Sequence, residues 1–174
     1  MTAPHEQLFT TWLTRHKNLI YKVVNAYAVS SDDQADLFQE IVLQLWLSVP
    51  HFQGRARETT WIYRVALNTA LVWKRTQRRK NKKLTINLPK LNEIADANDP
   101  PGACLATREL IDTVYQAIRT LPEPDKSIIL LHLDGLTYNE MADVLGISPT
   151  NVGVRLTRAR KKLAPLLKDL IDDL

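Results

Sequence analysis

The sequence is poor in the residues from which disulfides, metal centres and phosphate-binding loops are built. Cys104 is the only cysteine in 174 residues, which excludes an intrachain disulfide and a zinc site made of cysteines. Only five glycines occur, and none belongs to a Gly-rich phosphate loop. Four histidines are scattered without the spacing of a metal site or a catalytic triad: His5, His16, His51 and His132. We therefore expect no enzyme, no catalytic residue, no metal and no cofactor.

Long apolar runs are also absent from the sequence. No run approaches the roughly 20 residues that a membrane-spanning helix needs. The first residues lack the pattern of a signal peptide, and the single cysteine fits a reducing compartment. We therefore expect a cytoplasmic protein with no membrane insertion of its own.

Positive charge is concentrated in two segments of the chain. The net charge is only +4, but residues 64–83 hold eight Lys/Arg and no acid. Residues 148–163 hold five Lys/Arg and again no acid, whereas residues 108–147 hold three basic and seven acidic residues. Two separate cationic segments indicate an anionic partner that is contacted twice.

Apolar residues make up 45% of the chain and recur mostly at helical spacing. This pattern predicts an all-α fold of two small helical domains joined by a flexible linker. The first domain is expected at residues 5–83 and the second at residues 104–168. Residues 84–103, punctuated by prolines and polar residues, are expected to form the linker.

Start and stop signals divide the first domain into three predicted helices. Ser31, followed three residues later by Gln34, predicts a capping box at the start of the second helix. Pro50 should end that helix. Thr59 or Thr60 is expected to cap the third helix, which runs into the first cationic segment.

The strongest local pattern predicts a helix-turn-helix in the second domain. Thr137 and Glu140 have the spacing of a capping box, and Gly146 stands where a helix ends in the left-handed conformation. Ser148 should cap the following helix, with Pro149 at its first position. A short helix, a turn with glycine and a second helix form the geometry that places a recognition helix in the DNA major groove.

The predicted recognition helix supplies cationic and hydrogen-bonding side chains. Basic residues can neutralise phosphates and some can reach bases, and polar residues near the helix N-terminus can bond either. The candidates are Thr150, Asn151, Arg155, Arg158, Arg160, Lys161 and Lys162.

Several segments together resemble the extracytoplasmic-function (ECF) type of bacterial RNA polymerase sigma factor. LPE at 121–123, DGLTYNEMADVLGIS at 134–148 and RLTRAR at 155–160 resemble region four of that family. ADLFQEIVLQLW at 35–46 and TWIYRVALNTA at 60–70 resemble its region two. Both blocks occur in the order found in the family, which makes the pair more specific than a helix-turn-helix alone.

The resemblance implies two partners and a division of roles. Core RNA polymerase and promoter DNA would be bound together, and transcription initiation would become promoter-specific. Region two would open the minus-ten element and hold a flipped base, whereas region four would read the minus-thirty-five element. An anti-sigma factor is a further candidate partner, because many relatives are held inactive by one.

Particular residues of the first domain match functional positions of the family. Asp36, Gln39 and Glu40 match positions that contact the polymerase clamp, and their spacing places them on one helical face. Asn68 matches a position of the flipped-base pocket, and the loop at 52–58 corresponds to the specificity loop.

The cationic end of the third helix is expected to contact phosphates of the minus-ten region. Its candidate residues are Arg64, Lys74, Arg75, Arg78 and Arg79, followed by Lys80.

Two residues depart from the family pattern. Gly153 and Val154 lie in the middle of the recognition helix, where relatives carry a basic and a small polar residue. The missing side chain removes one DNA contact, so minus-thirty-five recognition should be weaker or differently specified.

A conventional helix-turn-helix regulator is the alternative function. Such a regulator would need a ligand-binding or dimerisation domain in place of the first unit.

Overall fold

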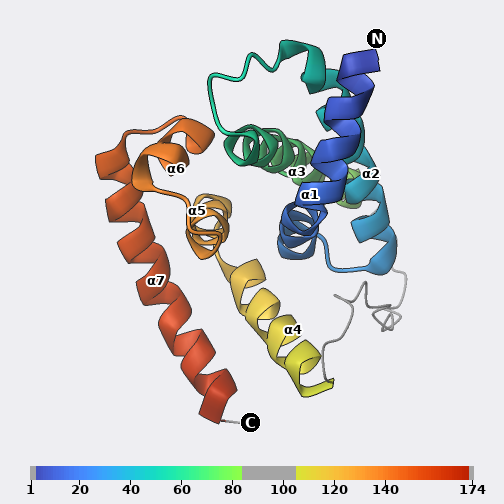
Figure 1. Ribbon diagram of the computed structural model, residues 1–174. Helices are drawn as coiled ribbons and strands as arrows, with labels where there is room; N and C mark the ends of the chain where they lie inside the picture. The colour runs from blue at the N-terminus through green and yellow to red at the C-terminus, as the bar shows by residue number, and fades with distance from the viewer. Residues whose placement is uncertain (1–2, 84–104, 173–174) are drawn as a thin grey trace. The chain divides into compact units, whose positions relative to one another are not determined.

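The computed structural model describes the backbone of residues 3–83 and 105–172, and side chains within residues 4–79 and 110–168 (Figure 1). All regular structure in these ranges is helical, which confirms the predicted fold class. The predicted linker at 84–103 and the side chain of Lys80 lie outside the described residues. None of the described helices combines the length and apolarity needed to cross a membrane.

The chain forms two compact units, and the border between them lies within a helix and not at a helix end. The first unit contains the described residues up to Arg55 and those from Val65 to Lys83. The second unit contains Ala56–Arg64 and the described residues from Leu105 onward. The division therefore falls inside one continuous helix, α3 (Glu58–Lys83). The domain borders at 83 and 104 stay a prediction.

The first unit is built from α1 (Ala3–Tyr27), α2 (Ser31–Ser48), the short 3-10 helix η1 (Val49–His51) and the larger part of α3. α1 packs against α2 and η1, and its backbone leaves helical geometry at His16 (φ −117°, ψ 15°). The largest fully buried side chains of α1 and α2 are Trp12, Ile20, Tyr27, Leu37, Ile41 and Leu45. Two helical stripes thus meet in one apolar core.

Two predicted helix caps in this part of the chain are wrong. α2 is capped by Ser30 and not by Ser31: Ser30 Oγ accepts a hydrogen bond from the Asp33 amide at 3.2 Å. Ser30 has the extended conformation of a cap, so the first of two adjacent serines takes that role. α3 begins at Glu58, and Thr60 is buried within its first turn instead of capping it.

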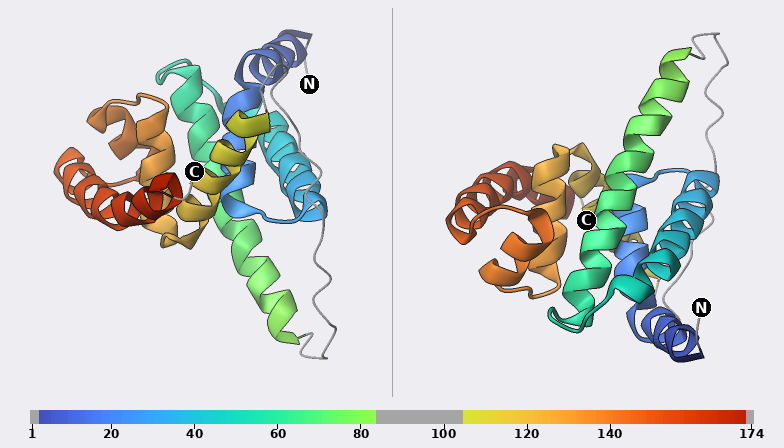
Figure 2. Two further views of the ribbon diagram at one scale, coloured as in Figure 1. Left: turned by 90° about the horizontal axis from the view of Figure 1, so that it is seen from below. Right: turned by 90° about the horizontal axis from the view of Figure 1, so that it is seen from above.

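The second unit contains α4 (Leu105–Thr120), α5 (Glu123–Leu133), α6 (Tyr138–Leu145) and α7 (Pro149–Asp172). α5 packs against α4, α6 and α7 (Figure 2). Every residue of α5 from Asp125 to Leu131 is buried. α5 is therefore the central helix on which the other three are held.

The predicted helix-turn-helix is confirmed in its local bonding. Thr137 and Glu140 form both hydrogen bonds of a capping box at the start of α6. Gly146 ends α6 in the left-handed conformation (φ 65°, ψ 36°), and its amide donates to the Ala142 carbonyl. Ser148 Oγ then accepts from the Asn151 amide at 3.3 Å, and Pro149 is the first residue of α7. These bonds satisfy helix-end groups that would otherwise lack partners.

Glycine-to-alanine substitutions at two positions should change stability in opposite directions. Gly146→Ala should lower the free energy of unfolding by about 1 kcal/mol, because a Cβ atom disfavours the left-handed conformation. Gly153 lies inside α7, and its added Cβ would meet the Tyr138 ring at 3.4 Å, an ordinary contact distance. Gly153→Ala should therefore raise the free energy by up to about 1 kcal/mol. Urea unfolding of both variants measures the two changes in the free energy of unfolding, and changes of the same sign would contradict the prediction.

Candidate nucleic-acid interface

α7 has one buried side and one exposed side. Val152, Leu156, Ala159 and Leu163 are buried at i, i+4, i+7 and i+11 and face α4, α5 and α6. A helix turns about 100° per residue, so the residues between these positions lie on the opposite side or on the two flanks of the helix. The exposed residues of its first four turns are Pro149, Thr150, Asn151, Val154, Thr157, Arg158, Arg160, Lys161 and Lys162.

The predicted DNA-contacting residues of α7 do not all share the same surroundings. Thr150, Asn151, Arg158 and Lys161 are exposed, and Arg155 is half-buried at the flank of this surface. Arg160 lies on the opposite flank, where its guanidinium contacts the imidazole of His132 on α5. We name the exposed surface of Thr150, Asn151, Val154, Arg158 and Lys161 the α7 face.

Lys162 of α7 forms an ion pair with an acidic residue of the same unit. Its Nζ lies 2.5 Å from Oδ2 of Asp125 on α5. The Asp125 side chain is only 12% exposed, so this carboxylate depends on Lys162 for compensation. The ion pair therefore anchors α7 to α5 and leaves Lys162 less available to a phosphate than Lys161.

Four predicted residues of α3 lie along one exposed helix face. Arg64, Asn68, Arg75 and Arg79 are spaced by four, seven and four residues, and each is exposed. The buried residues Ile62, Ala66, Thr69 and Ala70 lie on the other side of the helix. We name this exposed row of three arginines and one asparagine the α3 face.

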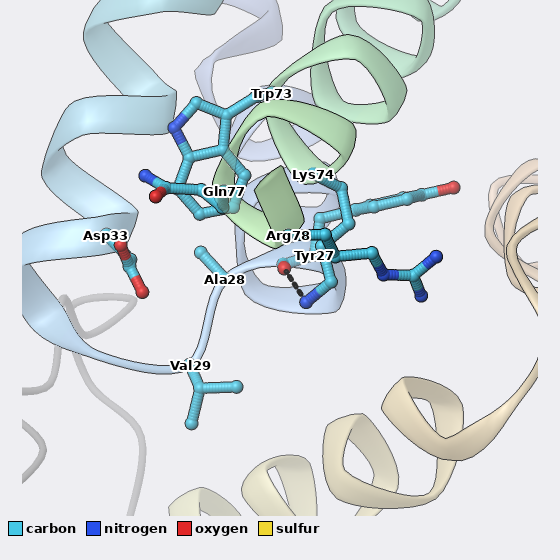
Figure 3. Close-up of a pocket in the computed structure, with 8 residues that line it drawn as sticks. All are labelled: Tyr27, Ala28, Val29, Asp33, Trp73, Lys74, Gln77 and Arg78. Atoms are coloured by element: carbon cyan, nitrogen blue, oxygen red, sulfur yellow. Dashed lines mark hydrogen bonds between the residues drawn. The ribbon is translucent and has the colours of Figure 1, made fainter. Parts of the chain in front are cut away.

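Lys74 and Arg78 line a small pocket of the first unit (Figure 3). Trp73 and Gln77 complete the wall formed by α3, whereas Tyr27, Ala28, Val29 and Asp33 come from the end of α1 and the start of α2. Lys74 Nζ donates to the Tyr27 carbonyl oxygen at 3.4 Å. Lys74 therefore satisfies a carbonyl at the end of α1, where a cation also suits the helix dipole.

The acidic face predicted on α2 continues into exposed leucines. Asp36 and Gln39 are exposed, and Glu40 is half-buried with its Oε1 accepting from Gln44 Nε2 at 3.0 Å. Leu43 and Leu47 follow at i+7 and i+11 from Asp36 and are 49% and 53% exposed. We name these five residues, Asp36, Gln39, Glu40, Leu43 and Leu47, the α2 stripe. The two leucines were missed from the sequence, although their spacing from Asp36 already places them on its side of the helix.

The loop predicted to determine specificity begins with an anchored residue. The Phe52 ring packs edge-on against Trp12 of α1, with ring centroids 5.1 Å apart. Gln53, Gly54 and Arg55 are exposed beyond it, and Gly54 has a positive φ of 68°. The contact of Phe52 therefore fixes the start of the loop against the apolar core, and the exposed residues follow directly after it.

Comparisons with known proteins match both units of the chain. Residues 9–80 match the family described as Sigma-70 region 2, and residues 111–163 match the family described as Sigma-70, region 4. The ECF RNA polymerase sigma-E factor of Haemophilus influenzae is 30% identical over 173 residues, which cover 93% of this chain and 90% of that protein. The sigma-E factor of Escherichia coli K12 is 28% identical, with 94% and 90% covered.

Two solved structures share the fold at low sequence identity. One is the sigma factor RpoE with the anti-sigma factor NepR from Bartonella quintana, with a TM-score of 0.72 and 19% identity. It covers 94% of this chain and 98% of that one. The other is CnrH with the cytosolic domain of CnrY, with a TM-score of 0.64 and 21% identity, covering 94% and 90%.

Removing Lys162 should destabilise the protein more than removing its neighbour Lys161. Lys162→Met leaves the mostly buried Asp125 carboxylate without its cation, which should cost about 1–2 kcal/mol of unfolding free energy. Lys161→Met removes an exposed cation and should change stability by less than about 0.5 kcal/mol. Chemical unfolding of both variants measures the difference, and equal losses would mean that the ion pair contributes nothing.

Stability should also depend on the charge of His132. Burial, followed by the positive charge of Arg160, lowers the pKa of His132. A His with a lowered pKa in the folded state favours folding while neutral. This contribution is present above its unfolded pKa of about 6.5 and is lost as pH falls through the folded value. Wild-type protein should therefore lose more unfolding free energy between about pH 7.5 and pH 5 than His132→Gln, which does not titrate. Parallel losses would refute this contribution.

Proposed function

We propose that two helices of this chain contact two different elements of one promoter. The chain belongs to the extracytoplasmic-function type of sigma-70 factors, and it acts with RNA polymerase in transcription initiation. The family is one of initiation factors and not of enzymes. The observation that carries the proposal is that two separate helices, α3 and α7, each present an exposed cationic face. Two such faces on one chain suit two contacts with one promoter.

The α7 face is proposed to read the minus-thirty-five element as duplex DNA. α7 is the second helix of a confirmed helix-turn-helix, the helix that enters the major groove in this motif. Arg158 and Lys161 supply exposed cations for phosphates, and Thr150 and Asn151 lie near the helix N-terminus, where base edges are met. Arg155 extends this surface at its flank, whereas Arg160 positions the helix through His132.

The α3 face is proposed to hold the opened minus-ten element. Arg75 and Arg79 lie on one exposed side of α3 and can contact successive phosphates of a backbone. Arg64 begins the same row, and its guanidinium also donates to the Asp143 carbonyl oxygen of α6. Asn68 lies in the same row, and its amide can bond a base edge. Arg78 adds a cation beside the α3 face, and Lys74 supports α3 through its bond to α1.

The α2 stripe is proposed to contact core RNA polymerase. Asp36 and Glu40 offer acceptors to a basic partner surface, whereas Leu43 and Leu47 offer exposed apolar area. Apolar side chains at the centre with polar groups beside them are the usual composition of a protein–protein interface. This combination distinguishes the α2 stripe from the two cationic faces.

An anti-sigma protein is proposed as a further partner. The structure of RpoE from Bartonella quintana was solved with the anti-sigma factor NepR, and it shares the fold of this chain.

A cytoplasmic location follows from the proposed binding to core RNA polymerase.

Substitutions in the α2 stripe should weaken binding to core RNA polymerase without unfolding the protein. Replacing Asp36, Gln39 and Glu40 together by Ala, or Leu43 alone by Ala, should each lower affinity by about tenfold or more. The side chains are largely exposed, so thermal unfolding should hardly change. Fluorescence-detected binding to core polymerase, followed by heparin-resistant transcription, measures both effects.

The matched control is Glu6→Ala, which removes one exposed acid from α1 of the same unit. This control should bind core polymerase like wild type. Full affinity of both α2-stripe variants would refute the proposed polymerase surface. A wild-type protein that ignores core polymerase but binds duplex DNA tightly by itself would instead indicate a conventional helix-turn-helix regulator.

A further inference from the structure

We propose that Val154 reads the methyl group of a thymine in the minus-thirty-five element, which makes it a specificity-determining residue of the α7 face. The inference rests on the proposed function and assigns one step of recognition to one side chain. Val154 is 45% exposed and lies about 200° around the helix from the buried Val152. It is therefore directed away from the core of its unit.

The surroundings of Val154 suit a base edge rather than a protein partner. Its neighbours one turn away are Thr150 and Arg158, and Lys161 follows at i+7; all three are exposed and polar or charged. An apolar protein surface would desolvate these groups without compensation. The DNA major groove presents phosphates and polar base edges, and its one prominent apolar group is the C5-methyl of thymine.

Thr157 strengthens the apolar character at this point. Its Oγ1 donates to the Gly153 carbonyl at 2.9 Å, so the hydroxyl proton is used within the helix. Thr157 lies three residues from Val154 and is exposed, so its methyl group adds to the same small apolar patch. Threonine methyl groups are among the usual contacts of thymine.

Gly153 leaves space beside Val154. It has no side chain to compete for the base, and the ring of Tyr138 covers the helix at this position, 3.4 Å from where a Cβ would lie. Of these two adjacent residues, Val154 is therefore the one that presents a side chain on the α7 face.

The test uses the complete chain bound to core RNA polymerase. Holoenzyme first selects duplexes from a library randomised over the minus-thirty-five region. Each thymine of the selected sequence is then replaced, one at a time, by uracil, which lacks the C5-methyl group. We expect at least one uracil to weaken wild-type binding about fourfold, the effect of one buried methyl. In Val154→Ser the same uracil should cost less than about 1.5-fold, because the contact is already lost.

The matched control is Val29→Ser. Val29 is also an exposed valine: its side chain is 64% exposed, and it lies in the loop between α1 and α2. This variant should keep the full uracil penalty. Valine and serine have similar helix propensities, so Val154→Ser should fold normally.

The possible results separate the inference from the proposed function. A selected element without thymine, or uracil penalties that persist unchanged in Val154→Ser, would overturn the role of Val154 and leave the sigma-factor assignment intact. Failure of the holoenzyme to select any sequence would overturn the proposed minus-thirty-five reading and the role of Val154 with it.

Discussion

The burial of one stripe of α7 against α5 determines what the second unit can present to a partner. Val152, Leu156, Ala159 and Leu163 must face the core, and the helical period then fixes the direction of every other side chain. The turn at Gly146 and the cap at Ser148 set where α7 begins, and so they set which residues form that stripe. A helix start displaced by one residue would rotate Arg158 and Lys161 by about 100° and replace the α7 face by another set of side chains.

The parts of the fold that depend on local chemistry were predictable from the sequence. The Thr137–Glu140 capping box and the left-handed Gly146 need only residues within one turn of each other, and both are confirmed. The cap of α2 was assigned to Ser31, the wrong one of two adjacent serines. Ser30 and Ser31 are both good caps, and backbone conformation, which the sequence does not state, selects Ser30.

The roles of individual cations were not predictable, because they depend on residues distant in sequence. Lys162 and Lys161 are adjacent and chemically identical, but only Lys162 meets Asp125, 37 residues earlier in the chain. Lys74 meets the carbonyl of Tyr27, and Arg160 meets His132. Charge counting along the sequence therefore found the two cationic segments correctly. It could not separate the cations that bond to another helix of the chain from those that stay exposed.

The exposed faces of α2, α3 and α7 differ in composition although each helix buries an apolar stripe in the same way. Substitutions at exposed positions usually change stability by less than about 0.5 kcal/mol, so folding places little constraint on them. Their composition is then free to follow the partner. Leucines beside acids on α2 suit a protein surface, and arginines in a row on α3 suit a phosphate backbone. A single exposed valine is ordinary on any protein. Val154 becomes informative because it lies between polar and charged residues on the helix that faces DNA in this motif, where the partner itself offers one apolar group.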